Sequence, residues 1–257
     1  MIACLAFAAL VPITLAFGGD VMLGRGIEKA GVPPFGPAAE VLRSADLAFV
    51  NLECPLTERP FERRKVVNLR ARPERVQWLV EAGIDGVSVA NNHTGDCGRE
   101  GLRDTVSALE GAGLFVAGLD ALQSFPIRVV RGVRFGFLAL TDFRSDAAPG
   151  VLVVDPETLE SQVRGYASQV DHLVVSLHWG VEGARKPTPR QRELAARVRR
   201  GGASLVVGHG THTLLPLEGG LAYSLGDLVF DRRGDRALLV AEVVGRRVTA
   251  RLRKFSQ

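Results

Sequence analysis

The segment HLVVSLHWGVEGARKPTPRQRELAARVRRGGASLVVGHGTH spans residues 172–212 and decides the fold class. Its two apolar runs, at 172–177 and 204–208, have the length and composition of buried strands. The stretch between them, at 189–202, begins with Pro and ends with Gly, as helices commonly do. A strand, a helix and a second strand in this order predict an α/β fold.

The same alternation continues along the rest of the chain. Helix-like and strand-like segments follow one another, and two further stretches, at 127–135 and 242–252, have the pattern of β-hairpins, so the sheets should be mixed rather than purely parallel. We therefore expect one domain over residues 11–257, an α/β mixed-sheet sandwich flanked by helices. The other predicted strands are 13–17, 46–50, 86–90, 114–118, 133–140 and 237–244, and the other predicted helices are 37–45, 73–83, 99–113 and 155–168.

Composition excludes several classes of protein. Hydrophobic residues make up 46% of the 257 residues and charged residues 23%, which is typical of a globular chain and not of a disordered one. The net charge of +4 is small, and no basic tract is interleaved with aromatic residues, so we expect no nucleic-acid partner. The three cysteines, Cys4, Cys54 and Cys97, form no CxxC pair, which argues against both a disulfide framework and thiolate zinc.

The N-terminal segment MIACLAFAALVPITLAF carries no charge. It lacks the basic start of a signal peptide, and its second half leads directly into Gly18, Gly19 and Asp20, which favours a buried first strand. Residues 1–10 are then either part of that strand or the remnant of an export segment. Membrane association and localisation stay open.

Polar side chains follow five of the predicted strands. They are carboxylates, carboxamides and imidazoles: Asp20, Glu53, Asn91 with Asn92, His178, and His209 with His212. Because ligands of open α/β sheets bind outside the carboxyl ends of the strands, we expect these groups to converge. Imidazole nitrogens combined with carboxylate and carboxamide oxygens suit a divalent transition metal.

Six motifs give the sequence a family resemblance. In chain order they are GDVMLGR (19–25), NLECPLT (51–57), ANNHTGDCG (90–98), LHWGVE (177–182), GHGTH (208–212) and YSLGDLVFD (223–231). The chain resembles the CapA family of capsule and poly-gamma-glutamate biosynthesis proteins over about residues 14–231. That resemblance implies a calcineurin-like metallophosphoesterase fold and one or two bound ions of manganese, zinc or iron.

The resemblance also implies roles for individual residues. The metal ligands would be Asp20, Glu53 as the bridging carboxylate, Asn92, His178, His209 and His212. By the same resemblance, His93 stands where phosphoesterases keep a catalytic histidine, Arg25 would anchor substrate, and Glu182 would support the site from behind. The substrate would be an anionic polymer or a small anionic precursor, with other capsule-synthesis proteins as partners and an extracytoplasmic or membrane-associated location.

Three positions depart from the phosphoesterase pattern. Met22 occupies the place of an expected histidine, Glu53 replaces Asp, and one extra residue separates His209 from His212. We therefore expect unequal sites: a tight ion that depends on Asn92, His178 and His209, and a weak one that depends on His212. Two functions follow, a metal-dependent hydrolase or transferase, which the other motifs favour, and a non-catalytic polymer-binding or assembly factor, which Met22 favours.

Overall fold

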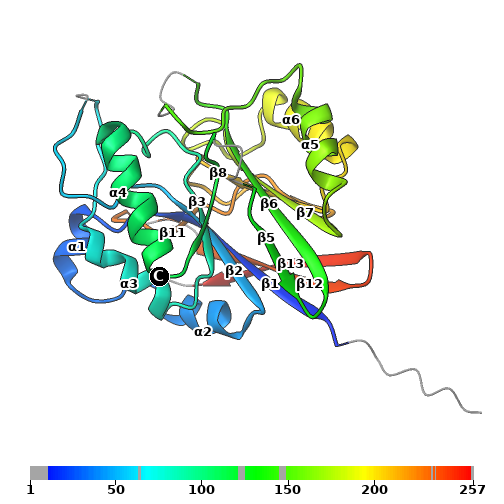
Figure 1. Cartoon of the computed structure of the whole chain (residues 1–257), viewed down its shortest axis with the longest axis horizontal. Helices are drawn as coiled ribbons and strands as arrows, with labels where there is room; N and C mark the ends of the chain where they lie inside the picture. The colour runs from blue at the N-terminus through cyan, green and yellow to red at the C-terminus, as the bar shows by residue number, and fades with distance from the viewer. Residues whose placement is uncertain are drawn as a thin grey trace, which may run out of the picture.

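The computed structural model describes residues 11–62, 65–120, 125–144, 149–232, 234 and 236–255. Two β-sheets pack face to face, and helices cover the outer face of each (Figure 1). The predicted mixed-sheet α/β sandwich is thus confirmed. The expectation for residues 1–10 lies outside the described residues. Within the described part of the chain, none of the helices has the length and apolarity needed to cross a membrane.

The first sheet has the order β13-β12-β1-β2-β3-β4, and β11 adds to the end of β1. The strands β1 to β4 run parallel to one another, whereas β12 and β13 form an antiparallel hairpin beside β1. Their bounds are β1 Ile13–Val21, β2 Leu47–Leu52, β3 Gly86–Ser88, β4 Phe115–Ala117, β11 Asp227–Val229, β12 Arg236–Val244 and β13 Arg247–Phe255.

The second sheet has the order β5-β6-β7-β8-β10-β9. Its central strands β6, β7 and β8 are parallel, and His178 at the end of β7 pairs with His209 at the end of β8. The bounds are β5 Ile127–Val130, β6 Val133–Thr141, β7 His172–His178, β8 Leu205–His209, β9 Leu217–Glu218 and β10 Leu221–Ala222. Both predicted hairpins are present, as β5–β6 and β12–β13.

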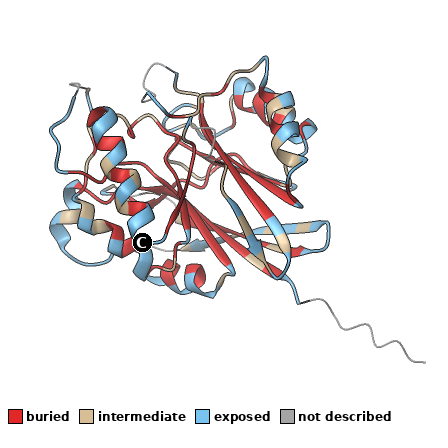
Figure 2. Ribbon diagram, viewed as in Figure 1, coloured by how far each residue is buried: buried red, intermediate tan, exposed pale blue. Residues whose placement is uncertain are grey.

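Aromatic side chains fill the space between the sheets. Phe49 and Phe115 of the first sheet lie 5.2 and 4.8 Å, centroid to centroid, from the ring of Phe137 in the second sheet. Figure 2 shows that buried residues run through both sheets, while the outer faces of the helices are exposed. Since both faces of the central strands are covered, these strands read as continuous apolar runs in the sequence.

The helices are α1 Arg25–Ala30, α2 Pro37–Ser44, α3 Val76–Glu81 preceded by the 3₁₀ turn Pro73–Arg75, α4 Gly98–Gly111, α5 Leu159–Ala167 and α6 Pro189–Arg200. The start of α6 carries a capping box, in which the side chains of Thr188 and Gln191 bond each other's backbone N–H groups. The predicted helix 155–168 was too long at its start, because Asp155 accepts hydrogen bonds from the Glu157 N–H and the Thr158 hydroxyl and so holds a turn there.

Several element boundaries differ from the sequence prediction in ways that matter for the site. The strand predicted at 13–17 continues to Val21, because β11 pairs in parallel with its end and brings Asp227 opposite Asp20. Gly19 permits this approach, since a Cβ there would collide with the carbonyl oxygen of Gly226. The strands predicted at 86–90 and 114–118 are shorter, ending at Ser88 and Ala117.

Candidate metal centre

The carboxyl ends of the parallel strands in both sheets meet at one edge of the sandwich. Five of these ends contribute polar side chains: Asp20 from β1, Glu53 just after β2, Asn92 after β3, His178 from β7, and His209 and His212 from β8 and the turn that follows. All five strand ends were predicted to converge. The structure brings the acidic and imidazole side chains among them into one buried cluster, called the strand-end cluster below.

Asp20 lies at the centre of this cluster. Its carboxylate oxygens are 3.3 Å from His212 Nδ1, 3.5 Å from His209 Nδ1 and 3.9 Å from His178 Nδ1. The Gly210 N–H donates to Asp20 Oδ2 at 3.1 Å. Gly210 adopts a positive φ of 93°, which a side chain would strain, and a Cβ there would lie 3.0 Å from His178 Nε2.

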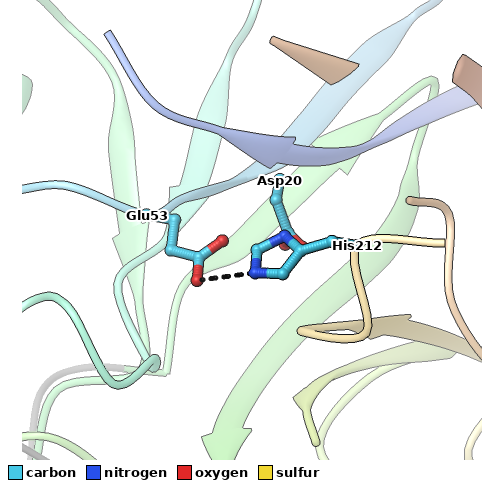
Figure 3. A group of neighbouring side chains, drawn as sticks. All are labelled: Asp20, Glu53 and His212. Atoms are coloured by element: carbon cyan, nitrogen blue, oxygen red, sulfur yellow. Dashed lines mark ion pairs between the residues drawn. The ribbon is translucent and has the colours of Figure 1, made fainter. Parts of the chain in front are cut away.

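Glu53 faces the same histidines from the opposite side. Its Oε1 is 3.5 Å from His178 Nε2 and 3.7 Å from His212 Nε2. Figure 3 shows Asp20, Glu53 and His212 pointing toward one another from separate segments, and their ligand atoms lie within 4.8 Å of one another. This spacing would let a single ion contact all three side chains.

Several buried polar atoms of the predicted ligands have no hydrogen-bond partner among the described residues. They are both carboxylate oxygens of Glu53 and both ring nitrogens of His209, in the strand-end cluster, and Oδ1 of Asn92, on the loop after β3. Such groups are rare in folded proteins, because an unsatisfied buried polar group is costly. Carboxylate, imidazole and carboxamide donors are also the ligand types of a divalent metal, so the residues fit such an ion.

The two neighbouring asparagines have different roles. Asn91 is fully engaged: its Nδ2 donates to Asn51 Oδ1 and Leu52 O, and its Oδ1 accepts from the backbone N–H groups of His93 and Thr94. Asn91 therefore shapes the loop after β3. The side-chain oxygen of Asn92, by contrast, has no hydrogen-bond partner among the described residues.

Asn51 was not predicted as a site residue, yet it supports two of the candidate ligands. Its Nδ2 donates to Asp20 Oδ1 at 2.8 Å and lies 3.2 Å from His178 Nδ1. The sequence signal was its position as the last polar residue of the second strand, directly before Leu52 and Glu53. It orients the carboxylate and the imidazole that face the cluster.

A second supporting group holds His212. Asp227 Oδ1 lies 2.7 Å from His212 Nδ1, and Asp227 Oδ2 accepts from Arg232 Nε at 2.7 Å. Arg232 Nη1 also donates to Glu182 at 2.6 Å, so Glu182 is joined to His212 through Arg232 and Asp227. His212 has a positive φ of 56°, a conformation that non-glycine residues rarely adopt and that is frequent at functional sites.

Burial and charge shift the pKa values of the cluster in opposite directions. Burial raises the pKa of Glu53 well above its ordinary value, and the neighbouring Asp20 carboxylate adds to the effect. Burial likewise lowers the pKa of His178 to about 3. Burial also disfavours the charged form of His212, but the hydrogen bonds of its ring with Asp20 and Asp227 outweigh this and raise its pKa to about 11. A metal ion that binds these groups would have to displace protons from them, so its affinity would depend on pH.

His93 lies next to the cluster rather than in it. Its Nδ1 is 2.8 Å from Asp96 Oδ2, and Asp96 in turn forms an ion pair of 2.9 Å with Lys65 Nζ. Lys65 Nζ also donates to the Asn92 carbonyl oxygen at 2.6 Å, so this lysine connects Asp96 with the backbone of Asn92. The carboxylate holds the imidazole ring through Nδ1.

A cavity of about 240 Å³ opens beside these residues. We call it the site cavity. It is lined by Arg25, Val67, Leu69, His93, Glu182, His212, Phe230, Asp231 and Arg232. Arg25 has a positive φ of 54° and forms an ion pair of 3.1 Å with Asp231. The structure therefore places the two predicted catalytic residues, Arg25 and His93, on the wall of the same cavity as His212.

Met22 fills the place of the expected histidine. Its side chain is wholly buried, and its sulfur accepts a hydrogen bond from the Gly24 N–H at 3.1 Å. Nearby Cys54 is also buried, which raises the pKa of its thiol to about 12.

Comparison with known proteins decides the family. The sequence profile described as "Bacterial capsule synthesis protein PGA_cap" matches residues 14–232, most of the chain and all the residues of the strand-end cluster. The chain belongs to this family. The expected resemblance to capsule and poly-gamma-glutamate biosynthesis proteins is confirmed.

Several named bacterial proteins are similar to this chain over 86% of its length. The chain is 31% identical to the PGA biosynthesis protein CapA of Bacillus subtilis, and 31% identical to the capsule biosynthesis protein CapA of Bacillus anthracis. It spans 64% and 60% of the lengths of these two relatives. A probable polyglutamine synthesis accessory protein of Mycobacterium tuberculosis is also 31% identical, and the match covers 75% of its length.

Solved structures support the fold of this family member. A phosphatase from Mycoplasma pneumoniae superimposes with a TM-score of 0.62 at 15% identity, covering 95% of this chain and 94% of that one. A hypothetical protein from Thermus thermophilus gives a TM-score of 0.57 at 19% identity, covering 94% and 99%. These likenesses agree with the predicted calcineurin-like fold.

Proposed function

We propose that the protein is a metal-dependent hydrolase or transferase of capsule or poly-gamma-glutamate metabolism. Its substrate would be an anionic polymer or a precursor of one, cut or transferred at a phosphoester or amide bond. The names of its relatives support the metabolic setting, and the fold shared with a phosphatase agrees with hydrolytic chemistry.

One observation carries the proposal: the group of buried ligand atoms without hydrogen bonds on Glu53, His209 and Asn92. A protein that used this edge only for packing would have no reason to bury these atoms unsatisfied. Together with Asp20, His178 and His212, they offer oxygen and nitrogen ligands from several strand ends. We propose these six residues as the ligands of one or two manganese, zinc or iron ions.

A bound divalent ion would polarise a phosphoryl or carbonyl oxygen and activate water near neutral pH. The chain's own residues would perform the remaining tasks. His93, held at Nδ1 by Asp96, can donate a proton from Nε2 to the leaving group. Arg25, on the wall of the site cavity, can bind an anionic group of the substrate.

The alternative is a non-catalytic polymer-binding or assembly factor. The buried Met22 favours it, because a thioether in place of an imidazole removes one nitrogen ligand from the cluster. In that case the ions would hold the strand ends and the bound polymer together without turnover.

Turnover assays on the metal-loaded chain separate the two functions. A chromogenic phosphodiester and poly-gamma-glutamate would be supplied to the native protein, to His93→Ala and to an exposed control, Glu110→Gln. The proposal expects turnover of at least one substrate by the native protein and the control, with a large loss in His93→Ala at unchanged metal content. Binding of poly-gamma-glutamate with no turnover of either substrate would support the assembly factor instead.

A further inference from the structure

Arg232 is the feature of the site cavity that neither the metal ligands nor His93 explains. It follows β11 and lies on the cavity wall together with His93 and His212. Its side chain is held on three sides: Nε donates to Asp227 at 2.7 Å, Nη1 donates to Glu182 at 2.6 Å, and the guanidinium carbon lies 4.5 Å from the ring centroid of Phe230. These contacts fix the guanidinium in one orientation.

The third nitrogen of this guanidinium is unused. Arg232 Nη2 is buried and has no hydrogen-bond partner among the residues that the structure describes. A charged donor left unsatisfied costs more than a neutral one, so this position calls for an acceptor that arrives with a ligand or with water. An anionic oxygen makes the stronger, charge-assisted bond.

The other groups on the cavity wall indicate what Arg232 would bind. His212, a member of the strand-end cluster, and Arg25 line the same cavity. Nε has no further N–H to give, because it is engaged with Asp227, whereas both N–H groups of Nη2 are left for a ligand.

We propose that Arg232 is a substrate anchor whose Nη2 binds one oxygen of a phosphate or carboxylate group in the site cavity. The proposal takes the anionic nature of the substrate from the proposed function, but the binding itself requires no catalysis. Arg232 also holds Asp227, and through it His212, so a test must separate anion binding from metal retention.

The test is calorimetric titration of the metal-loaded full chain with inorganic phosphate and, in a second arm, with N-acetylglutamate. Metal content is measured for every sample, and affinity is expressed for the metal-loaded fraction. The variants are Arg232→Gln, which removes the charge, and Arg232→Lys, which keeps a charge for Asp227 but lacks the spare nitrogen. Arg134→Gln serves as the control, because Arg134 also pairs with a carboxylate, Asp171, but is exposed and does not line the cavity.

The proposal expects native protein and Arg134→Gln to bind at least one of the two anions with equal affinity. Both Arg232 variants should bind that anion at least tenfold more weakly, and Glu182→Gln, which removes a competing carboxylate, should bind it no less tightly. The arm that responds identifies phosphate or carboxylate as the ligand. The proposal is overturned if native protein binds neither anion, or if the metal-loaded fractions of both Arg232 variants bind as native protein does.

The outcome is independent of the proposed function. Anion binding that depends on Arg232 in a chain that turns over no substrate would reject catalysis and keep the anchor. Turnover with Arg232 variants that retain native KM and anion affinity would reject the anchor alone.

Discussion

Replacing Glu53 by Gln should have opposite effects on the thermal stability of the metal-free and the metal-loaded protein. In the metal-free protein the Glu53 carboxyl is buried without hydrogen bonds, and burial holds its pKa well above the ordinary value. Folding therefore favours the protonated form, and stability is lost as pH rises above the pKa of the unfolded chain. A neutral amide avoids that loss, so metal-free Glu53→Gln should unfold at the same temperature as native protein or a higher one at pH 7.

The metal-loaded proteins should differ in the opposite sense. An ion present at a hundred times its Kd stabilises the native protein by about 2.7 kcal/mol, which raises Tm by roughly 5–11 °C for a chain of this size. Removing one unit of charge beside a divalent ion costs about 8 kcal/mol at a separation of 4 Å and an effective dielectric constant of about 20. This loss exceeds the gain, so the metal-induced rise in Tm should almost vanish in the variant.

Thermal unfolding monitored by circular dichroism, with and without manganese or zinc, measures both effects. Glu110→Gln is the matched control, because Glu110 is exposed on α4 and should leave both temperatures unchanged. A Glu53→Gln variant that keeps the full metal-induced rise, or that unfolds several degrees lower when metal-free, would refute the reasoning.

The same geometry leads to four further predictions. His209→Ala should abolish the tighter ion, whereas His212→Ala should remove mainly the weaker one; elemental analysis of each variant checks this, and equal losses would contradict unequal sites. Metal binding at pH 7 should release protons, because the surrounding carboxylates raise the pKa of His212 to about 11 and burial raises that of Glu53. Metal affinity should therefore rise with pH. Calorimetry in buffers of different ionisation enthalpy counts the protons released, and a count of zero would contradict the prediction. Asp96→Asn should lower turnover on the order of 10²-fold or more at unchanged metal content, since it frees the ring of His93; native rates would exclude His93 as the acid. Thr188→Ala should cost about 1 kcal/mol through the capping box of α6, measured by urea unfolding, where no shift in midpoint would argue against the cap.

Most of the fold was predictable because its central strands are covered on both faces. Buried parallel strands are continuous apolar runs, and helices with Pro starts and Gly ends separate them clearly in the sequence. The short strands β9, β10 and β11 were missed, since two or three residues carry no periodicity that distinguishes a strand from a loop. The continuation of β1 through Asp20 was missed for the same reason, because it depends on pairing with β11.

The convergence of the acidic and imidazole side chains was predictable, but the residues that hold them were not. The acidic and imidazole residues follow strand ends in the sequence, and parallel strands bring their carboxyl ends to one edge. The residues that hold them come from distant segments: Asp227 and Arg232 reach His212 only through the fold, and Lys65 reaches Asp96 across a loop. No spacing in the sequence reports such contacts, because they depend on how loops of different strands meet.

The metal content of the purified chain tests the central claim most directly. Native protein and the double variant His178→Ala with His209→Ala would be loaded with manganese, zinc or iron, desalted and analysed for bound metal per chain. We expect at least one ion per native chain and nearly none in the double variant, with both proteins folded by circular dichroism. An unchanged metal stoichiometry in the folded double variant would contradict the assignment of the metal centre to the strand-end cluster.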